Sequence, residues 1–255
     1  MESTGRPLPD PGTVNAAIPQ RTAVITGAAG TLGSAIASQL LDYGWTVFAG
    51  RHRSPLPLEH PNLHPFPLDV TDPAAWEDMA TQLTGTLPHL DAFIHSAGIA
   101  RDRLLAQATL QDWDETFATN VHAIALGTRA LLPLLKRAPV PHVLCISSLA
   151  SRAGGTGQSA YAASKAALNG LATSLARELS TDGIRVNTLF PGALMGSMTD
   201  KLSPSAREHL AAANLLGSLN DPTEVARFAA FLLSTRQISG QVFNLDSRIP
   251  SGSAS

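Results

Sequence analysis

Thr22-Ala23-Val24-Ile25-Thr26-Gly27-Ala28-Ala29-Gly30-Thr31-Leu32-Gly33 is the stretch that decides the fold. Residues 22–26 predict a short apolar strand, and the apolar periodicity of residues 32–43 predicts a helix that ends at Gly44. The glycines between strand and helix allow the backbone to approach a ligand closely, and the free N–H groups at a helix start attract phosphates. This unit therefore predicts a dinucleotide site, and the alternative is a simple strand-to-helix turn.

The same alternation of strand and helix continues along the chain. Further strands are predicted at residues 46–49, 65–68, 90–95, 142–147, 184–189 and 241–245, and further helices at 73–83, 111–136, 160–181 and about 205–213. Continuous apolar strands that alternate with helices are typical of a parallel sheet with both faces covered. We predict a single-domain α/β Rossmann fold, with a doubly wound parallel sheet of about seven strands.

Composition excludes several classes of protein. The chain has 255 residues, 44% of them hydrophobic, and a net charge of −2 without a basic block, so neither nucleic acid nor an anionic membrane is an expected partner. No apolar segment reaches the roughly 18 residues of a membrane span. The single cysteine, Cys145, lies in an apolar run and is expected to be a buried structural thiol. We expect no metal site.

The two ends of the chain differ from the middle. Residues 1–20 hold four prolines and no apolar core of a secretory signal, and we expect a disordered extension there. The oxidoreductase domain is expected to span residues 21–249, with a loose tail at 250–255. A cytoplasmic location is expected.

Tyr161 and Lys165 stand four residues apart in a predicted helix, so their side chains share one face. A phenol ionises near pH 10, and a neighbouring ammonium is expected to lower this pKa, so that Tyr161 exchanges a proton with a carbonyl or alcohol oxygen. Ser148 lies thirteen residues upstream of the tyrosine. Taken alone, the Tyr-x-x-x-Lys spacing does not identify a catalytic pair, because it also occurs commonly by chance on ordinary helix faces.

The end of the second predicted strand indicates which dinucleotide is bound. Arg51 and Arg53 stand where an acidic residue would hold ribose hydroxyls, and arginine pairs well with a 2′-phosphate. This favours NADP(H) over NAD(H), unless both arginines are solvated surface charges. Asp69 and Val70, after the third strand, are candidates for the adenine contact, or Asp69 is a turn or N-cap residue.

Together these residues resemble the short-chain dehydrogenase/reductase family from about residue 21 to 246. The resemblance places the family's active-site residues on Asn120, Ser148, Tyr161 and Lys165. The cofactor-binding residues that it implies are Thr26, Gly27, Gly30, Thr31, Leu32, Gly33, Arg51, Arg53, Asp69, Val70, Ser96, Ala97, Gly98, Tyr161, Lys165, Pro191, Gly192 and Leu194.

Four departures from the family pattern stand out. Thr31 replaces a glycine of the classical subgroup, and Gly196 replaces a threonine that contacts the nicotinamide amide, so Ser197 or the backbone of Leu194 is expected to make that contact. His95-Ser96 replaces two asparagines, and packing is preferred to catalysis for His95. Asp246-Ser247-Arg248 replaces the usual Gly-rich ending of the substrate site.

The resemblance also implies a mechanism. Tyr161 gives a proton to the substrate oxygen as hydride arrives, Ser148 stabilises the developing oxyanion, and Lys165 binds the nicotinamide ribose. Asn120 is expected to hold a water that links Lys165 to solvent, or simply to kink its helix. Residues 193–216 are expected to form a mobile flap, whose Met195, Met198 and Leu202 line an acyl channel or form the flap's own core.

Within the family, residues 98–105, 222–226 and 238–241 look most like the 3-oxoacyl-[acyl-carrier-protein] and acetoacetyl-CoA reductases. We therefore expect NADPH-dependent reduction of a 3-oxoacyl thioester on acyl carrier protein or CoA. The alternatives are a carbonyl reductase or alcohol dehydrogenase on another ketone, and a non-catalytic NADP sensor. A homotetramer packed through helices near residues 123–135 and 163–175 is expected, although buried helices of a monomer would show the same pattern. Arg129, Lys136 and Arg137 are a candidate patch for an acidic carrier, or an ordinary solvated helix face.

Overall fold

The computed structural model describes residues 21–197 and 199–248. The expected extension at residues 1–20, residue 249 and the tail at 250–255, and Met198 of the expected acyl channel lie outside the described residues. In the described part, no helix is long and apolar enough to cross a membrane.

A parallel sheet of seven strands forms the centre of the molecule, as predicted. Its order is β3-β2-β1-β4-β5-β6-β7. The strands are β1 Thr22–Thr26, β2 Thr46–Arg51, β3 Leu63–Pro67, β4 Ala92–His95, β5 His142–Ile146, β6 Arg185–Phe190 and β7 Val242–Asn244. The chain order reverses between β1 and β4, and open α/β sheets bind ligands in the crevice outside the carboxyl ends of the strands at such a point.

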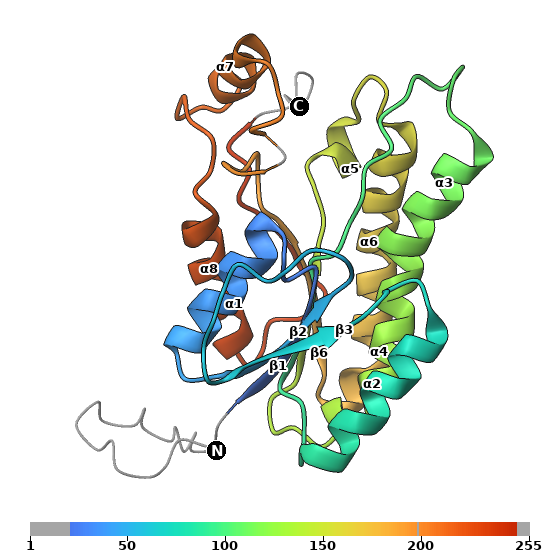
Figure 1. Cartoon of the computed structure of the whole chain (residues 1–255), viewed down its shortest axis with the longest axis vertical. Helices are drawn as coiled ribbons and strands as arrows, with labels where there is room; N and C mark the ends of the chain where they lie inside the picture. Colours follow the sequence, from blue (N-terminus) through green and yellow to red (C-terminus); the bar gives the residue numbers. More distant parts are fainter. Residues whose placement is uncertain (1–20, 198, 249–255) are drawn as a thin grey trace, which may run out of the picture.

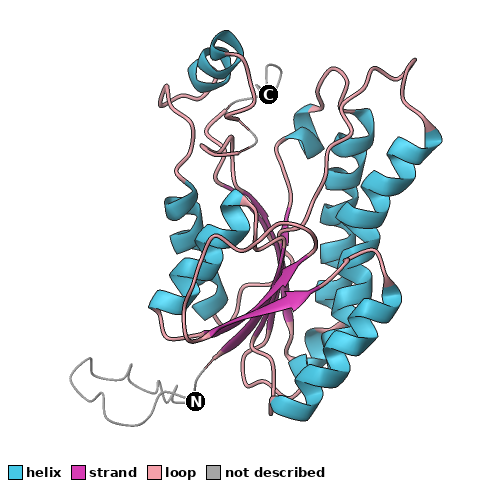
Figure 2. Cartoon of the chain, in the orientation of Figure 1, coloured by secondary structure: helices cyan, strands magenta, loops and turns pink. Residues whose placement is uncertain are grey.

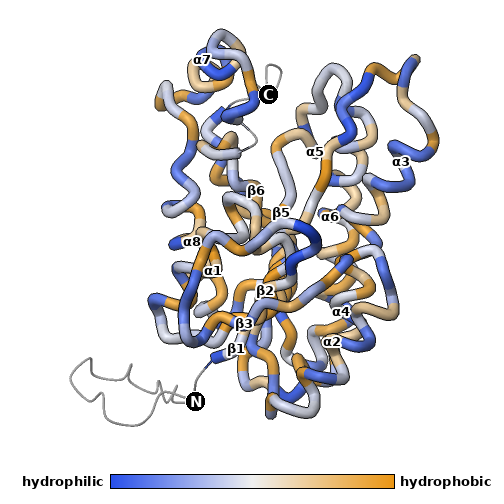
Figure 3. The backbone as a smooth tube through the Cα atoms, viewed as in Figure 1, coloured by the Kyte–Doolittle hydropathy of each residue, from blue (hydrophilic) through white to orange (hydrophobic). Residues whose placement is uncertain are grey.

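Helices cover both faces of the sheet (Figures 1 and 2). Helices α1 (Thr31–Asp42) and α8 (Pro222–Ser234) pack together on one face, and α2 (Pro73–Thr86), α4 (Ala123–Leu135) and α6 (Ser159–Glu178) lie on the other. Each face has its own apolar core, one built around α1 and α8 and one around α2, α4 and α6. Hydrophobic residues accordingly concentrate along the strands in Figure 3. These two layers explain the continuous apolar strands in the sequence.

The remaining elements are shorter. They are α3 (Leu110–Phe117), the π-helical turn η1 (Ala118–His122), α5 (Ala150–Ala153), the 3₁₀ turn η2 (Ser180–Asp182) and α7 (Pro204–Ala212). Helices α5 and α8 were not predicted, although Asp221 and Pro222 supply a typical helix start for α8. Two prolines in β3 are tolerated because that strand is at the edge of the sheet.

The predicted single helix over residues 111–136 is wrong in one respect. The described chain divides it into α3, η1 and α4, with the π-helical turn in the middle. Part of the apolar face of α4 that was expected to pack in an oligomer is buried within the single chain instead, because Ile124, Leu131 and Leu134 lie in its core. The apolar periodicity of α4 is therefore explained by the fold of a single chain.

Candidate active site

The glycine turn after β1 is shaped by close backbone contacts. A Cβ atom on Gly27 would lie 2.7 Å from the Cα of Ala97, and one on Gly33 would lie 2.3 Å from the carbonyl oxygen of Gly27. Gly27 also has a φ of +65°, which favours glycine. Gly30 is the N-cap of α1, and no side chain caps this helix. The first-turn N–H groups are thus without a side-chain acceptor, which suits the phosphates of a dinucleotide.

His95 connects this turn to the π-helical turn. Its Nδ1 atom lies 3.0 Å from the Thr26 hydroxyl, and its Nε2 atom lies 3.2 Å from the carbonyl oxygen of Thr119. A carbonyl only accepts, so Nε2 carries the proton, and Nδ1 accepts from Thr26. The Thr26 hydroxyl in turn accepts from the backbone N–H of Ala97 at 3.2 Å. Complete burial lowers the pKa of His95 to about 3, with a smaller effect of the Lys165 charge, so the imidazole is neutral.

Asn120, in the π-helical turn, is completely buried and held on three sides. Its Nδ2 donates to the carbonyl of Ile99 and to the Ser164 hydroxyl, each at 2.9 Å, and its Oδ1 accepts from the N–H of Ile99 at 2.9 Å. These contacts fix the loop after β4 against α6. Asn120 therefore lies in a distorted part of the helix, and its role in holding a water stays a prediction.

Lys165 projects from α6 into the same buried space. Its ammonium donates a 2.9 Å hydrogen bond to the carbonyl of Ile146, the last residue of β5. A Cβ on Gly98 would lie 3.3 Å from this ammonium and 3.2 Å from the Oδ1 of Asn120, so a larger residue there would have to push these two side chains slightly apart. Burial lowers the pKa of Lys165 to about 8. The Ser147 hydroxyl donates to the backbone carbonyl of Lys165 at 2.9 Å, which is a packing role.

Tyr161 lies one turn before Lys165, and the lysine nitrogen is 5.8 Å from the centroid of its ring. Burial raises the pKa of the Tyr161 phenol above its ordinary value, Ser148 acts in the opposite direction, and Asp102 adds to the rise. The net direction is opposite to the lowering expected from the sequence, because desolvation of the phenolate is the larger effect. Tyr161 is therefore a protonated donor at neutral pH.

The arginines predicted to pair with the 2′-phosphate lie at the carboxyl end of β2. Arg51 is its last residue, and His52 and Arg53 follow it. The Nε2 of His52 is 3.6 Å from Asp69, whose Oδ1 accepts from the N–H and hydroxyl of Thr71 at 2.9 and 2.7 Å. These bonds, with smaller effects of His52 and Arg53, hold the pKa of Asp69 below its ordinary range. Asp69 thus stabilises its own turn.

The backbone of Val70 is held in place by the indole of Trp76. The Nε1 of Trp76 donates to the carbonyl oxygen of Val70 at 2.9 Å, and Asp72, not Asp69, is the N-cap of α2. The indole uses one of the two lone pairs of this carbonyl oxygen and fixes the turn that contains Asp69 and Val70.

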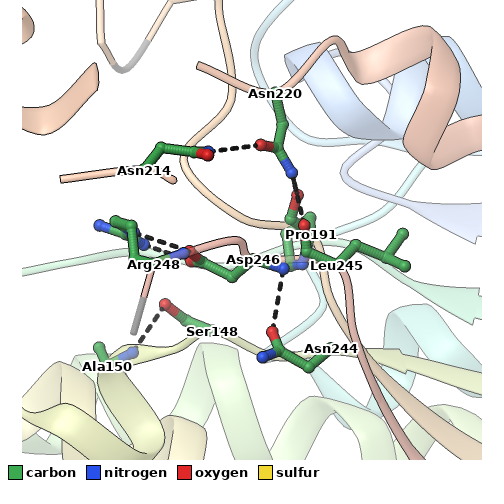
Figure 4. A network of polar contacts seen from close by, with 9 residues as sticks. All are labelled: Ser148, Ala150, Pro191, Asn214, Asn220, Asn244, Leu245, Asp246 and Arg248. Carbon is green, nitrogen blue, oxygen red and sulfur yellow. Dashed lines mark hydrogen bonds and ion pairs between the residues drawn. The ribbon is translucent and has the colours of Figure 1, made fainter. Parts of the chain in front are cut away.

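The base of the flap depends on Asn220, which was not among the predicted site residues. Its Nδ2 donates to the carbonyls of Pro191 and Leu245 at 3.0 and 2.7 Å, and its Oδ1 accepts from Asn214 at 3.1 Å (Figure 4). Gly192 is required because a Cβ there would lie 2.4 Å from the Nδ2 of Asn220. The only local signal at Asn220 is the helix start that follows it, which says nothing of these distant partners.

The departure at the C-terminal wall forms a partly buried ion pair. The carboxylate of Asp246 accepts from the Nε and backbone N–H of Arg248 at 2.8 and 3.0 Å, and this contact raises the pKa of Arg248 (Figure 4). The backbone of Arg248 pairs with Asn214 of the flap, and the N–H of Leu215 donates to Ser247. The wall and the flap are therefore joined.

Many side chains of the flap are exposed. Met195 and Leu202 are 42% and 41% exposed, so neither forms a buried core of the flap. Met195 instead lines a cavity of about 370 Å³ beneath α7, together with Pro204, Arg207, Glu208, Ala211 and Leu219. In the described ranges, no group of His, Cys, Asp and Glu side chains could hold a metal ion.

The structure therefore brings Asn120, Tyr161, Lys165 and the turn at Gly98 to the carboxyl edge of the sheet, beside the uncapped start of α1. Pro191 and Gly192 close the same edge after β6. A proton donor beside an anion-binding turn can transfer a proton to a carbonyl oxygen while a bound dinucleotide supplies hydride.

The sequence is similar to one family model and to several known reductases. Residues 27–247 match the family model described as "Enoyl-(Acyl carrier protein) reductase". The "3-oxoacyl-[acyl-carrier-protein] reductase FabG" of Thermotoga maritima is 32% identical over 236 residues, which cover 89% of this chain and 96% of that protein. The protein of the same name from Rickettsia typhi is 34% identical over 230 residues, covering 89% and 95%. The chain belongs to the short-chain dehydrogenase/reductase family of nicotinamide-dependent oxidoreductases.

Proposed function

We propose that this protein reduces a 3-oxoacyl thioester to the 3-hydroxyacyl thioester with NADPH. The observation that carries the proposal is the protonated, partly buried phenol of Tyr161 beside Lys165, at the edge of the sheet where the uncapped glycine turn lies. The likeness to relatives named 3-oxoacyl-[acyl-carrier-protein] reductases supports the thioester. The arginines at the end of β2 support NADPH.

The proposed roles follow from the contacts of each side chain. Bound NADPH would supply hydride to the ketone carbon. The Tyr161 hydroxyl donates its proton to the ketone oxygen, and the Ser148 hydroxyl stabilises the charge that develops there. Lys165 holds positive charge beneath the phenol as the phenolate forms, and solvent returns the proton afterwards. Asn120 is a positioning residue that fixes the loop at Ile99.

The glycine turn and its neighbours are proposed to hold the cofactor. The phosphates would meet the first-turn N–H groups of α1, and the 2′-phosphate would pair with Arg51 and Arg53. The other residues proposed for this surface are Thr26, Gly27, Gly30, Thr31, Leu32, Gly33, Asp69, Val70, Ser96, Ala97, Gly98, Pro191, Gly192 and Leu194.

We also propose a homotetramer and, as one possible substrate carrier, acyl carrier protein. For an acidic carrier, the basic patch is smaller than the sequence suggested, because the Lys136 ammonium pairs with Asp182 at 2.9 Å. Arg129 and Arg137 remain as its candidates. Light scattering after size exclusion tests the tetramer.

The decisive experiment measures NADPH oxidation with acetoacetyl-CoA, with NADH in parallel. Strong turnover with NADPH and weak turnover with NADH is the expected result. Binding of NADPH without oxidation would retain the cofactor and reject this substrate, and a panel of other ketones would then test the carbonyl reductase alternative. Failure to oxidise NADPH with any of these ketones would favour the non-catalytic sensor.

A further inference from the structure

Thr31, the first residue of α1, contacts the base of the flap. The backbone N–H of Ser197 donates to the Thr31 hydroxyl oxygen at 3.2 Å, and the hydroxyls of the two residues are also 3.2 Å apart. These two bonds join segments that are 166 residues apart in the sequence. The glycine turn and the flap are thus in direct contact.

The fit between Thr31 and Gly196 is steric as well as polar. Gly196 has a φ of +137°, and a Cβ built there would lie 2.5 Å from the Cγ2 of Thr31 and 2.6 Å from its Oγ1. The threonine side chain therefore fills the space that a side chain at position 196 would need. The two departures from the family pattern at positions 31 and 196 are the two halves of one contact.

The segment that Thr31 holds is itself a formed turn. The Thr199 hydroxyl donates to the carbonyls of Leu194 and Gly196 at 2.8 and 3.0 Å, and the N–H of Asp200 donates to Gly196 at 2.9 Å. A bond to Ser197 therefore positions the whole turn. The next residues lead into the exposed helix α7, in which no residue is buried.

We propose that Thr31 is a positioning residue that latches the flap to the first turn of α1. Because Thr31 belongs to the uncapped helix start, an anion that binds there meets the residue that holds the flap, and the two events are coupled. The coupling to NADPH rests on the proposed function, whereas the latch itself does not. One hydrogen bond of this kind shifts an open–closed equilibrium by about fivefold.

Hydrogen exchange of the ligand-free protein tests the latch. The Thr31→Val variant keeps the shape of the side chain and loses the acceptor, and Thr31→Ser keeps the acceptor and loses the methyl group. We expect exchange of the Ser197 amide and the following turn to be about fivefold faster in Thr31→Val, and close to the parent rate in Thr31→Ser. Equal exchange in the parent and Thr31→Val proteins would overturn the latch.

A double-mutant cycle tests the steric half of the contact. Gly196→Ala should loosen the flap strongly when Thr31 is present, and less in a Thr31→Gly background, where only the backbone strain at position 196 remains. Equal effects in the two backgrounds would contradict the packing described here.

The coupling is tested by repeating the exchange measurement with NADPH at saturating concentration, as judged by cofactor fluorescence. Exchange of the flap should slow in the parent and Thr31→Ser proteins, and slow less in Thr31→Val. Equal slowing in Thr31→Val would overturn the coupling. Absence of NADPH binding to the parent protein would instead reject the proposed cofactor, and the ligand-free exchange would still decide the latch.

Discussion

The ammonium of Lys165 donates a hydrogen bond of 2.9 Å to the carbonyl oxygen of Ile146, at the carboxyl end of strand β5. This bond holds the lysine beneath the active-site edge of the sheet, where burial lowers its pKa to about 8. Positive charge at Lys165 is therefore present at neutral pH and is lost in the weakly alkaline range.

This pKa predicts the alkaline limb of the reaction. The kcat/KM for ketone reduction should be level near pH 7 and fall above about pH 8, approaching tenfold per pH unit, as Lys165 loses its proton. The phenol does not cause this limb, because its pKa is raised. Steady-state rates across pH 6–10 check the prediction, with the NADPH dissociation constant measured in parallel. A profile that stays level to pH 10 would contradict it.

Removing the phenolic hydroxyl should stop the chemistry and spare the cofactor. In Tyr161→Phe we expect kcat to fall by about 10²–10⁴-fold, the usual contribution of a general acid, while NADPH affinity changes little. Tyr43→Phe is the matched control, since that tyrosine is 62% exposed and should leave the rate unchanged. Turnover by Tyr161→Phe at the parent rate would exclude the proposed proton donor.

Cofactor preference should depend on Arg51. Its replacement by alanine should raise the KM for NADPH about 10–100-fold, the effect of losing a charge-assisted bond, and leave the KM for NADH almost unchanged. Arg53→Ala separates the contribution of the second arginine. Arg177→Ala, at an exposed position near the end of α6, is the control. If Arg51→Ala weakens both cofactors equally, the arginine does not read the 2′-phosphate.

The neutral imidazole of His95 should make the fold sensitive to acid. The pKa of His95 is about 3 in the folded chain and about 6.5 in the unfolded one. The stabilisation of the fold by the neutral imidazole is therefore fully present above pH 6.5 and is lost as the pH falls toward 3. In His95→Asn, the slope of the unfolding free energy in this range should decrease by about 1.4 kcal/mol per pH unit.

Urea denaturation at several pH values measures this slope. Buried His142, whose pKa burial also lowers, is present in both proteins and cancels in the comparison. His209→Asn, on the exposed surface of α7, should leave the slope as it is. An unchanged slope in His95→Asn would mean that His95 binds its proton equally in both states.

Asn220 should be the most sensitive residue of the flap base. Asn220→Asp removes the amide donor to the carbonyls of Pro191 and Leu245, and should lower the unfolding free energy by about 1–3 kcal/mol and raise substrate KM. Asn244→Asp is the control, because an exposed carboxylate still accepts from the N–H of Asp246. Similar losses in both variants would argue against a special role of Asn220.

Most strands of the sheet could be predicted from the sequence, because each strand is a local apolar run. The run at residues 22–26, for instance, needs only its neighbours in the chain to be recognised. A kink at Asn120 was one of two expectations, but the π-helical form of the turn was not predicted, because that side chain contacts Ile99 and Ser164, which are far away in sequence. Local periodicity contains no information about such partners.

The candidate site shows the same division. Spacing alone placed Tyr161 and Lys165 together, because one helix holds both. The direction of the phenol's pKa could not be predicted, since it depends on burial by the rest of the fold. Thr31 and Gly196 were recognisable as departures from the family pattern, but their mutual fit needs the folded chain.

Cys145 lies on β5 in the apolar core, completely buried, and burial raises the pKa of its thiol to about 12. A thiol reagent can therefore reach it only when the central strands separate from their covering helices. Since it is the single cysteine of the chain, its modification rate reports the opening of the core without any engineered probe. A ligand that binds only the closed protein should slow the modification of Cys145 in proportion to the fraction of protein that it occupies. The modification rate therefore measures ligand binding.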